Sequence, residues 1–233
     1  MTNWPAVWAV FAAGLAAGAY MTKVPPALPV LRGELGLTLV ESSFIATMFN
    51  VMGMVVGLLA GVVCDRFGHR RLALGGLVTM TAGGALGAVS AGFATLLASR
   101  FVEGVGFLLF VVSAPTLMTA VTANARDRVK ALGLWSSYMP TGGSIALLAA
   151  PPLIAGWGWQ GLWGVLALAA GACTILFARC VPPTRPAHVS SLRLVLESLA
   201  RKGNIAMALL FAFYVAQWTS IMVGCRLSWS STV

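Results

Sequence analysis

The chain has 233 residues, of which 59% are hydrophobic and 9% charged, with 15 Lys and Arg against 6 Asp and Glu. Soluble domains carry about 25% charged residues and about 20 apolar residues span a bilayer, so the composition excludes an ordinary soluble protein and leaves no room for a soluble catalytic module. The net charge of +9 would also suit nucleic acid, but the basic residues form short runs between apolar segments. The expected partner is a lipid bilayer, and no nucleic acid is expected.

Seven apolar segments, separated by charged or Gly/Pro-rich breaks, each predict a transmembrane helix. They cover about residues 5–30, 39–63, 72–92, 95–122, 130–152, 161–180 and 204–223. The first predicts an uncleaved helix rather than a signal peptide, because nothing basic precedes it and its apolar run continues past signal-peptide length. The predicted fold class is therefore an all-α membrane protein.

The distribution of Lys and Arg predicts how the helices are oriented. On one side, only Lys23 and Arg32 follow the first segment. The loops of the other side, after the second, fourth and sixth segments, hold Arg66, Arg70, Arg71, Arg126, Arg128, Lys130, Arg179, Arg185, Arg193, Arg201 and Lys202. Because basic loops stay in the cytoplasm, we predict that this second side and the N-terminus are cytoplasmic.

The loop between the second and third segments carries the most specific motif of the chain. It runs Gly61-Val62-Val63-Cys64-Asp65-Arg66-Phe67-Gly68-His69-Arg70-Arg71. The loop resembles the signature loop of the major facilitator superfamily, which has a Gly, three residues, Asp-Arg, any residue, a Gly and then basic residues. The resemblance implies a cytoplasmic latch between the two halves of a transporter, formed here by Gly61, Asp65, Arg66, Gly68, Arg70 and Arg71.

The resemblance also implies the architecture. Members usually have twelve helices in two six-helix halves, each half containing a 3+3 inverted repeat, with the substrate site between the halves. This chain would then supply the N-terminal six-helix bundle over residues 1–181, a cytoplasmic linker over 182–203 and a seventh helix over 204–223. Residues 224–233 change abruptly in character, and we hypothesise that a frameshift produced this tail in a chain truncated relative to twelve helices. Inspection of the encoding DNA tests the frameshift.

A second resemblance lies in the fourth segment, at Arg100-Phe101-Val102-Glu103-Gly104-Val105-Gly106. The superfamily pattern is Arg, two residues, often Gln, and then Gly-x-Gly, and Glu103 stands in the Gln position. Arg100 lies about five residues inside the apolar run, where a charge is costly, and Glu103 is on the same helical face. Two interpretations stay open, a substrate- or proton-coupling role and a structural ion pair.

Other polar side chains in the apolar segments are candidates for a central cavity, since such groups tend to face the bundle interior. Lys23 and Arg100 would together create a positive field that favours an anion, but a lysine that extends to the outer interface explains Lys23 equally well. Including these two, the substrate or proton-coupling candidates are Lys23, Arg100, Glu103, Tyr20, Asn50, Tyr138 and Gln217.

Enzyme and metal chemistry have no support in the sequence. The only two histidines, His69 and His188, have no neighbouring Cys or carboxylate at ligand spacing, and there is no nucleotide-binding glycine loop. The four cysteines show no paired metal spacing. We expect no catalytic residue, no cofactor, no metal and no disulfide.

The functional expectation follows from the superfamily resemblance. It implies a permease of a bacterial-type inner membrane that moves a small solute by alternating access, with proton coupling as the family expectation and an anion favoured by the positive field. In general appearance the chain is similar to the branch that contains cyanate and other small-anion permeases. The alternative is a truncated remnant, or a membrane-embedded partner subunit, that transports nothing alone. The sequence leaves the oligomeric state and the mode of coupling open.

Overall fold

The computed structural model describes residues 1–49, 52–53 and 67–183, together with Gly203, Ala206, Leu209, Leu210, Phe213 and Gln217. These residues contain helices and connecting turns and no strand, which confirms the all-α class. The chain divides into two compact units, Met1–Val189 and Ser190–Val233. Most of the predicted linker, the seventh helix and the 224–233 tail lie outside the described residues, as do Asn50, Gly61, Asp65 and Arg66.

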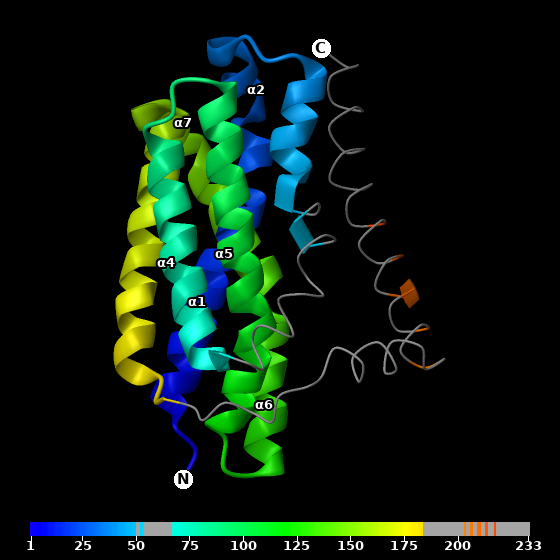
Figure 1. Ribbon diagram of the computed structural model, residues 1–233, viewed down its shortest axis with the longest axis vertical. Helices are drawn as coiled ribbons and strands as arrows, with labels where there is room; N and C mark the ends of the chain where they lie inside the picture. The colour runs from blue at the N-terminus through cyan, green and yellow to red at the C-terminus, as the bar shows by residue number, and fades with distance from the viewer. Residues whose placement is uncertain are drawn as a thin grey trace. The chain divides into compact units, whose positions relative to one another are not determined.

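The first unit contains the described helices of the bundle (Figure 1). They are α1 (Trp4–Thr22), α2 (Val24–Leu35), α4 (His69–Ala88), α5 (Phe93–Ala120), α6 (Ala125–Ser136) and α7 (Tyr138–Cys180), with a shorter apolar helix at Leu39–Phe49. Three helical stretches of the described residues are long and apolar enough to cross a membrane, Trp4–Leu35, Phe93–Ala120 and Ala125–Cys180.

The first predicted segment is longer in the structure than its apolar run of residues 5–30. It starts at Trp4, where the Asn3 side chain accepts a hydrogen bond from the backbone N–H of Ala6 at 3.2 Å and so caps α1. A break at Lys23 separates α1 from α2, which then runs to Leu35. Prolines occupy the first turn of α2, where the missing N–H has no intrahelical partner to lose.

The fifth and sixth predicted segments form one long helical stretch. The structure starts this stretch at Ala125, before the predicted residue 130, because the Asn124 side chain accepts from the Asp127 N–H at 2.8 Å and caps α6. Within α7 only Gly158 leaves the helical conformation, at φ 68° and ψ −179°. A left-handed φ of this kind favours glycine, and the break falls between the two predicted segments.

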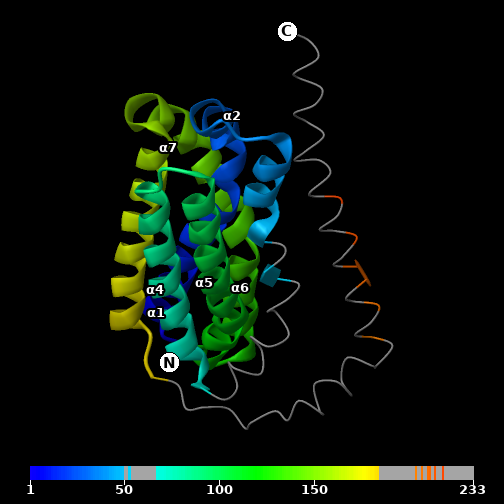
Figure 2. The same ribbon diagram turned by 45° about the horizontal axis from the view of Figure 1, so that its top comes forward.

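Glycines set how closely the helices approach one another. Both views show α4 and α5 side by side (Figure 1, Figure 2), and α1 packs against α5 and α7. A Cβ placed on Gly76 of α4 would lie 2.6 Å from the Gly106 carbonyl oxygen of α5, and one on Gly14 of α1 would lie 2.8 Å from the Trp135 ring. Small residues therefore let these backbones touch, as in other membrane bundles.

Two apolar clusters fill the bundle. One centres on residues such as Val10, Leu77 and Phe110, and the other on Leu31, Trp159 and Trp163. Charged side chains are nevertheless buried within the same bundle, and those of Lys23, Arg100 and Glu103 are all fully inaccessible to solvent.

Candidate functional site

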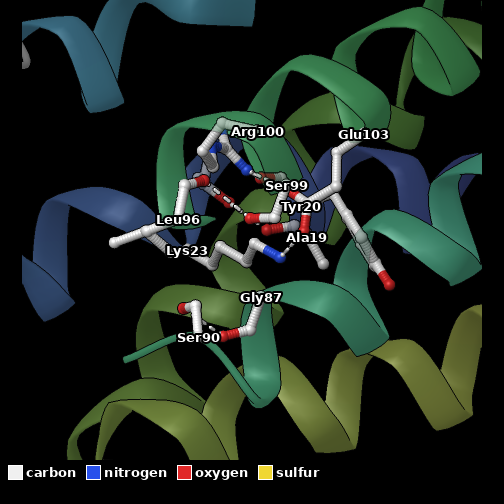
Figure 3. Close-up of polar contacts among 10 residues, drawn as sticks. Ala19, Tyr20, Lys23, Gly87, Ser90, Leu96, Ser99, Arg100 and Glu103 are labelled. Carbon is white, nitrogen blue, oxygen red and sulfur yellow. Dashed lines mark hydrogen bonds and ion pairs between the residues drawn. The ribbon is translucent and has the colours of Figure 1, made fainter. Parts of the chain in front are cut away.

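Lys23, Arg100 and Glu103 form one ion cluster, called here the buried triad (Figure 3). Lys23 Nζ lies 2.7 Å from Glu103 Oε1, and Arg100 Nη1 donates to the other carboxylate oxygen, Oε2. All three side chains have zero solvent exposure. The alternative in which Lys23 extends to the outer interface is therefore wrong, because its ammonium is held inside the bundle by a carboxylate.

Two elements supply the buried triad. Arg100 and Glu103 are three residues apart on α5 and so share one helical face. Lys23 comes from the break between α1 and α2, 80 residues earlier in the chain. Arg100 Nη1 also donates to the Tyr20 carbonyl oxygen at 3.2 Å. Since the last carbonyls of a helix lack intrahelical partners, this bond attaches α5 to the end of α1.

Aromatic rings surround the two cations. The Lys23 ammonium lies 4.0 Å from the Tyr20 ring centroid and 4.5 Å from that of Trp163, and Arg100 Cζ lies 4.1 Å from the Phe49 centroid. A cation over an aromatic face is attracted by the ring quadrupole, more strongly where water is excluded. The rings therefore replace part of the hydration that the cations lose on burial.

Four buried donor atoms around the buried triad have no hydrogen-bond partner within the described part of the chain. They are Tyr20 Oη, Arg100 Nε, Arg100 Nη2 and Trp163 Nε1. A buried polar atom without a partner is costly and uncommon. The site thus has an excess of donors over acceptors, so an added acceptor or negative charge would be stabilised there.

Helix α4 makes room for this site by presenting glycines to it. A Cβ on Gly83 would lie 2.8 Å from Glu103 Cγ, one on Gly84 would collide with the Tyr20 hydroxyl, and one on Gly87 would collide with the Trp163 indole. These three glycines share the face of α4 that packs on α5 and α7. Larger residues at these positions would push the aromatic rings and the carboxylate away from α4.

Arg70 of the signature loop connects two helix ends. Its Nε donates to the Val181 carbonyl at 2.7 Å and its Nη2 to the Ala178 carbonyl at 2.9 Å. These carbonyls end α7, where a cation is favoured by the helix dipole and by the free acceptors. Gly68 precedes α4 at φ 89°, in the region that favours glycine, whereas Arg71 is exposed.

A family model described as Major Facilitator Superfamily matches residues 7–230 of the chain. The chain belongs to this superfamily. Together with the apolar helices, this membership makes it a multi-pass membrane protein. The resemblance inferred from the signature loop is confirmed at the level of the superfamily.

Several curated proteins are similar to the chain. Major facilitator superfamily multidrug transporter mfsC of Aspergillus fumigatus is 24% identical over 67% of the chain, Methylenomycin A resistance protein of Bacillus subtilis is 26% identical over 75%, and Multidrug resistance protein Stp of Mycobacterium tuberculosis is 26% identical over 85%. The matches cover 30%, 37% and 34% of these relatives, so the chain spans about a third of their length.

The remaining candidates do not join the buried triad. Tyr138 stacks on Trp135 with ring centroids 4.2 Å apart, and no interaction among the described residues connects it to the buried triad. Gln217 is helical and exposed in the second unit. Asn50 is outside the described residues. Of the superfamily's signature positions, the structure describes Gly68, Arg70 and Arg71, so the latch as a whole stays a prediction.

The sequence analysis missed two aromatic members of the site and one polar contact between α2 and α7. Trp163 and Phe49 face the cations, yet an aromatic residue in an apolar segment carries no signal that separates it from a lipid-facing one. Glu34 accepts a hydrogen bond from Trp159 Nε1 at 2.8 Å and joins α2 to α7 beside the Gly158 break. Its pairing with a distant indole has no local sequence pattern.

Among the described residues, no group of three or more His, Cys, Asp or Glu side chains could hold a metal.

Proposed function

We propose that the chain is the N-terminal part of a secondary active transporter that works by alternating access, with the buried triad as its coupling site. The observation that carries this proposal is the complete burial of Lys23, Arg100 and Glu103 between the first helices and α5. Ionisable groups inside a membrane segment are costly and usually serve substrate or proton pathways. Membership of the major facilitator superfamily supports the transporter class.

The way the buried triad holds the helices supports the proposal of proton coupling. Glu103 binds Lys23 through one oxygen and Arg100 through the other, so it attaches the α1–α2 break to α5. Adding or removing one proton changes the charge inside a low-dielectric bundle, where Coulomb interactions are strong. Such a change would alter the relative energies of the packed and separated helix arrangements, which is the requirement for coupling a proton to a conformational step.

The substrate class is proposed from the relatives. The names of two relatives refer to resistance to methylenomycin A or to several drugs, so we propose export of small organic molecules. A small anion is the second candidate, because the buried triad holds two cations against one carboxylate and is surrounded by unpaired donors. The cyanate and small-anion branch finds no support among the relatives described above.

The proposed setting is a bacterial-type inner membrane with a cytoplasmic N-terminus. In this orientation the signature loop faces the cytoplasm, and Gly61, Asp65, Arg66, Gly68, Arg70 and Arg71 act as the latch on the outward-facing state. The bonds from Arg70 to the end of α7 support a role in joining the loop to the segment that leads into the proposed linker. The seventh helix would then continue toward a second six-helix half.

Reconstitution of the purified chain into proteoliposomes tests the proposal. With a pH gradient imposed, we expect flux of ethidium, as a fluorescent organic substrate, to depend on the gradient and to be lost in Asp65→Asn. Glu41→Gln is the matched control, because Glu41 is a partly exposed carboxylate bonded only to Thr38 among the described residues. Flux of radiolabelled cyanate without flux of ethidium would favour the anion candidate.

The same vesicles address the alternative of a remnant or partner subunit. A full-length relative reconstituted in parallel serves as the positive control. If the relative transports ethidium and the chain moves neither ethidium nor cyanate, the chain by itself is not a transporter. Flux restored on adding a separately expressed second half would identify the chain as a subunit.

A further inference from the structure

We propose that Lys23, and not the carboxylate Glu103, is the group of the buried triad that gains and releases a proton. The inference rests on the proposed coupling role of this site and names the residue that would perform it. It is carried by the count of charges in a cluster that has no contact with solvent. A carboxylate is the usual first candidate for a proton carrier, and the geometry points to the amine.

The three side chains allow few charge states. Arginine stays protonated in proteins, so Arg100 contributes one positive charge in every state. With Glu103 ionised, the buried triad has a net charge of +1 when Lys23 is protonated and zero when Lys23 is neutral. Protonating Glu103 instead would leave two unpaired cations and a net charge of +2. Since an uncompensated buried charge is strongly unfavourable, the low-energy change in protonation is at Lys23.

The surroundings supply no second carboxylate to the described site. From α1 the Tyr20 ring faces the Lys23 ammonium, from α5 Arg100 and Glu103, and from α7 the Trp163 ring. The side of α4 that contacts these rings presents Gly84 and Gly87, which have no ionisable group, and Phe49 of the preceding helix faces Arg100. The other described carboxylates bind elsewhere: Glu34 to Trp159, Glu41 to Thr38 and Asp127 to Thr2 and Asn124.

The proposed step is a simple acid dissociation. One N–H bond of the Lys23 ammonium breaks, its electron pair stays on Nζ, and the proton passes to a water molecule that reaches the site when the helices separate. Glu103 stays ionised and keeps its pair with Arg100 throughout. The reverse step restores the cation over the Tyr20 and Trp163 rings and raises the charge of the site by one unit.

A pH titration of tryptophan fluorescence in lipid nanodiscs tests the assignment, because the Lys23 ammonium lies 4.5 Å from the Trp163 ring centroid. Between about pH 5 and about pH 10, the range around ordinary His and Lys titration, we expect a single-proton transition in the part of the wild-type signal that comes from Trp163. Lys23→Met mimics the neutral amine and Lys23→Arg keeps the charge, so both variants should lose this transition. Trp163→Phe should remove most of its amplitude.

Infrared difference spectra over the same pH range examine Glu103 directly. We expect no carboxylic-acid C=O band that is removed by Glu103→Gln. The inference is overturned if such a band appears, if the fluorescence transition persists in Lys23→Met, or if the wild-type chain shows no transition. Should Lys23→Arg fail to fold, Lys23→Met and the wild-type infrared spectra still decide whether Lys23 or Glu103 carries the proton.

These measurements use neither substrate nor a gradient, so they separate this inference from the proposed function. A chain that titrates at Lys23 but moves no substrate would contradict the transport proposal and leave the titration assignment standing. Proton-dependent flux together with a transition that survives in Lys23→Met would support the transport proposal and overturn the assignment of the proton to Lys23.

Discussion

Glu103 is the residue on which the buried site depends, because it is the single described carboxylate that binds both cations. In Glu103→Gln the two cations stay buried with no negative charge between them. Removing one partner of a buried ion pair typically costs about 3–5 kcal/mol, and we expect a loss of unfolding free energy of that order. Denaturant titration in detergent micelles measures it. Glu41→Gln, at a partly exposed carboxylate that pairs with no cation among the described residues, should show no comparable loss.

A second prediction at the residue scale concerns the glycines of α4. In Gly84→Ala the added methyl group would collide with the Tyr20 hydroxyl, whereas nothing lies within 4 Å of a Cβ at Gly75 on the same helix. Overpacking a filled core typically costs about 1–3 kcal/mol. We expect Gly84→Ala to be destabilised by about this amount. Its tryptophan fluorescence should also change, because the Lys23 ammonium lies over both the Tyr20 ring and the Trp163 ring. Equal stability of Gly84→Ala and Gly75→Ala would contradict the packing described here.

At the scale of elements, Arg70 joins the beginning of α4 to the end of α7. Hydrogen bonds to charged groups contribute about 1.5–3 kcal/mol, so Arg70→Gln should open the last turn of α7 more often. Hydrogen exchange of the Val181 amide, which donates to the Phe177 carbonyl, should become at least about tenfold faster.

Arg71→Gln is the matched control for this prediction, because Arg71 is the adjacent arginine and is exposed. It removes the same charge from the same turn of α4. If both variants accelerate exchange equally, the effect is one of local charge and not of the two bonds to α7.

For the whole molecule, the side on which each loop lies is the prediction with the widest consequence. In a chain whose cysteines are replaced by alanine, Ala91→Cys places a single thiol at an exposed position between α4 and α5, and Arg128→Cys places one at an exposed position near the start of α6. Because basic loops stay in the cytoplasm, a membrane-impermeant maleimide added to intact cells should label Ala91→Cys. Arg128→Cys should react only after permeabilisation, and the reverse pattern would invert the proposed topology.

Much of the molecule could be predicted from local sequence properties. The all-helical membrane class follows from 59% hydrophobic and 9% charged residues, because an apolar segment in lipid must satisfy its backbone by forming a helix. The spacing from Gly61 to Arg71 identified the superfamily, and the three-residue spacing of Arg100 and Glu103 predicted their common face. Helix ends were less accurate, since caps such as Asn3 and Asn124 extend helices into polar sequence.

Tertiary structure alone decided the composition of the site. Lys23 and Glu103 are 80 residues apart, and the bonds from Arg70 to the end of α7 join positions 108 and 111 residues apart. Such contacts depend on how the helices rotate and slide against one another. That arrangement is determined by close approaches at residues such as Gly83 and Gly84, and no local pattern states it. The sequence by itself therefore determined the class, the family and the common helical face of Arg100 and Glu103, whereas helix packing decided that a lysine, with its aromatic neighbours, completes the site.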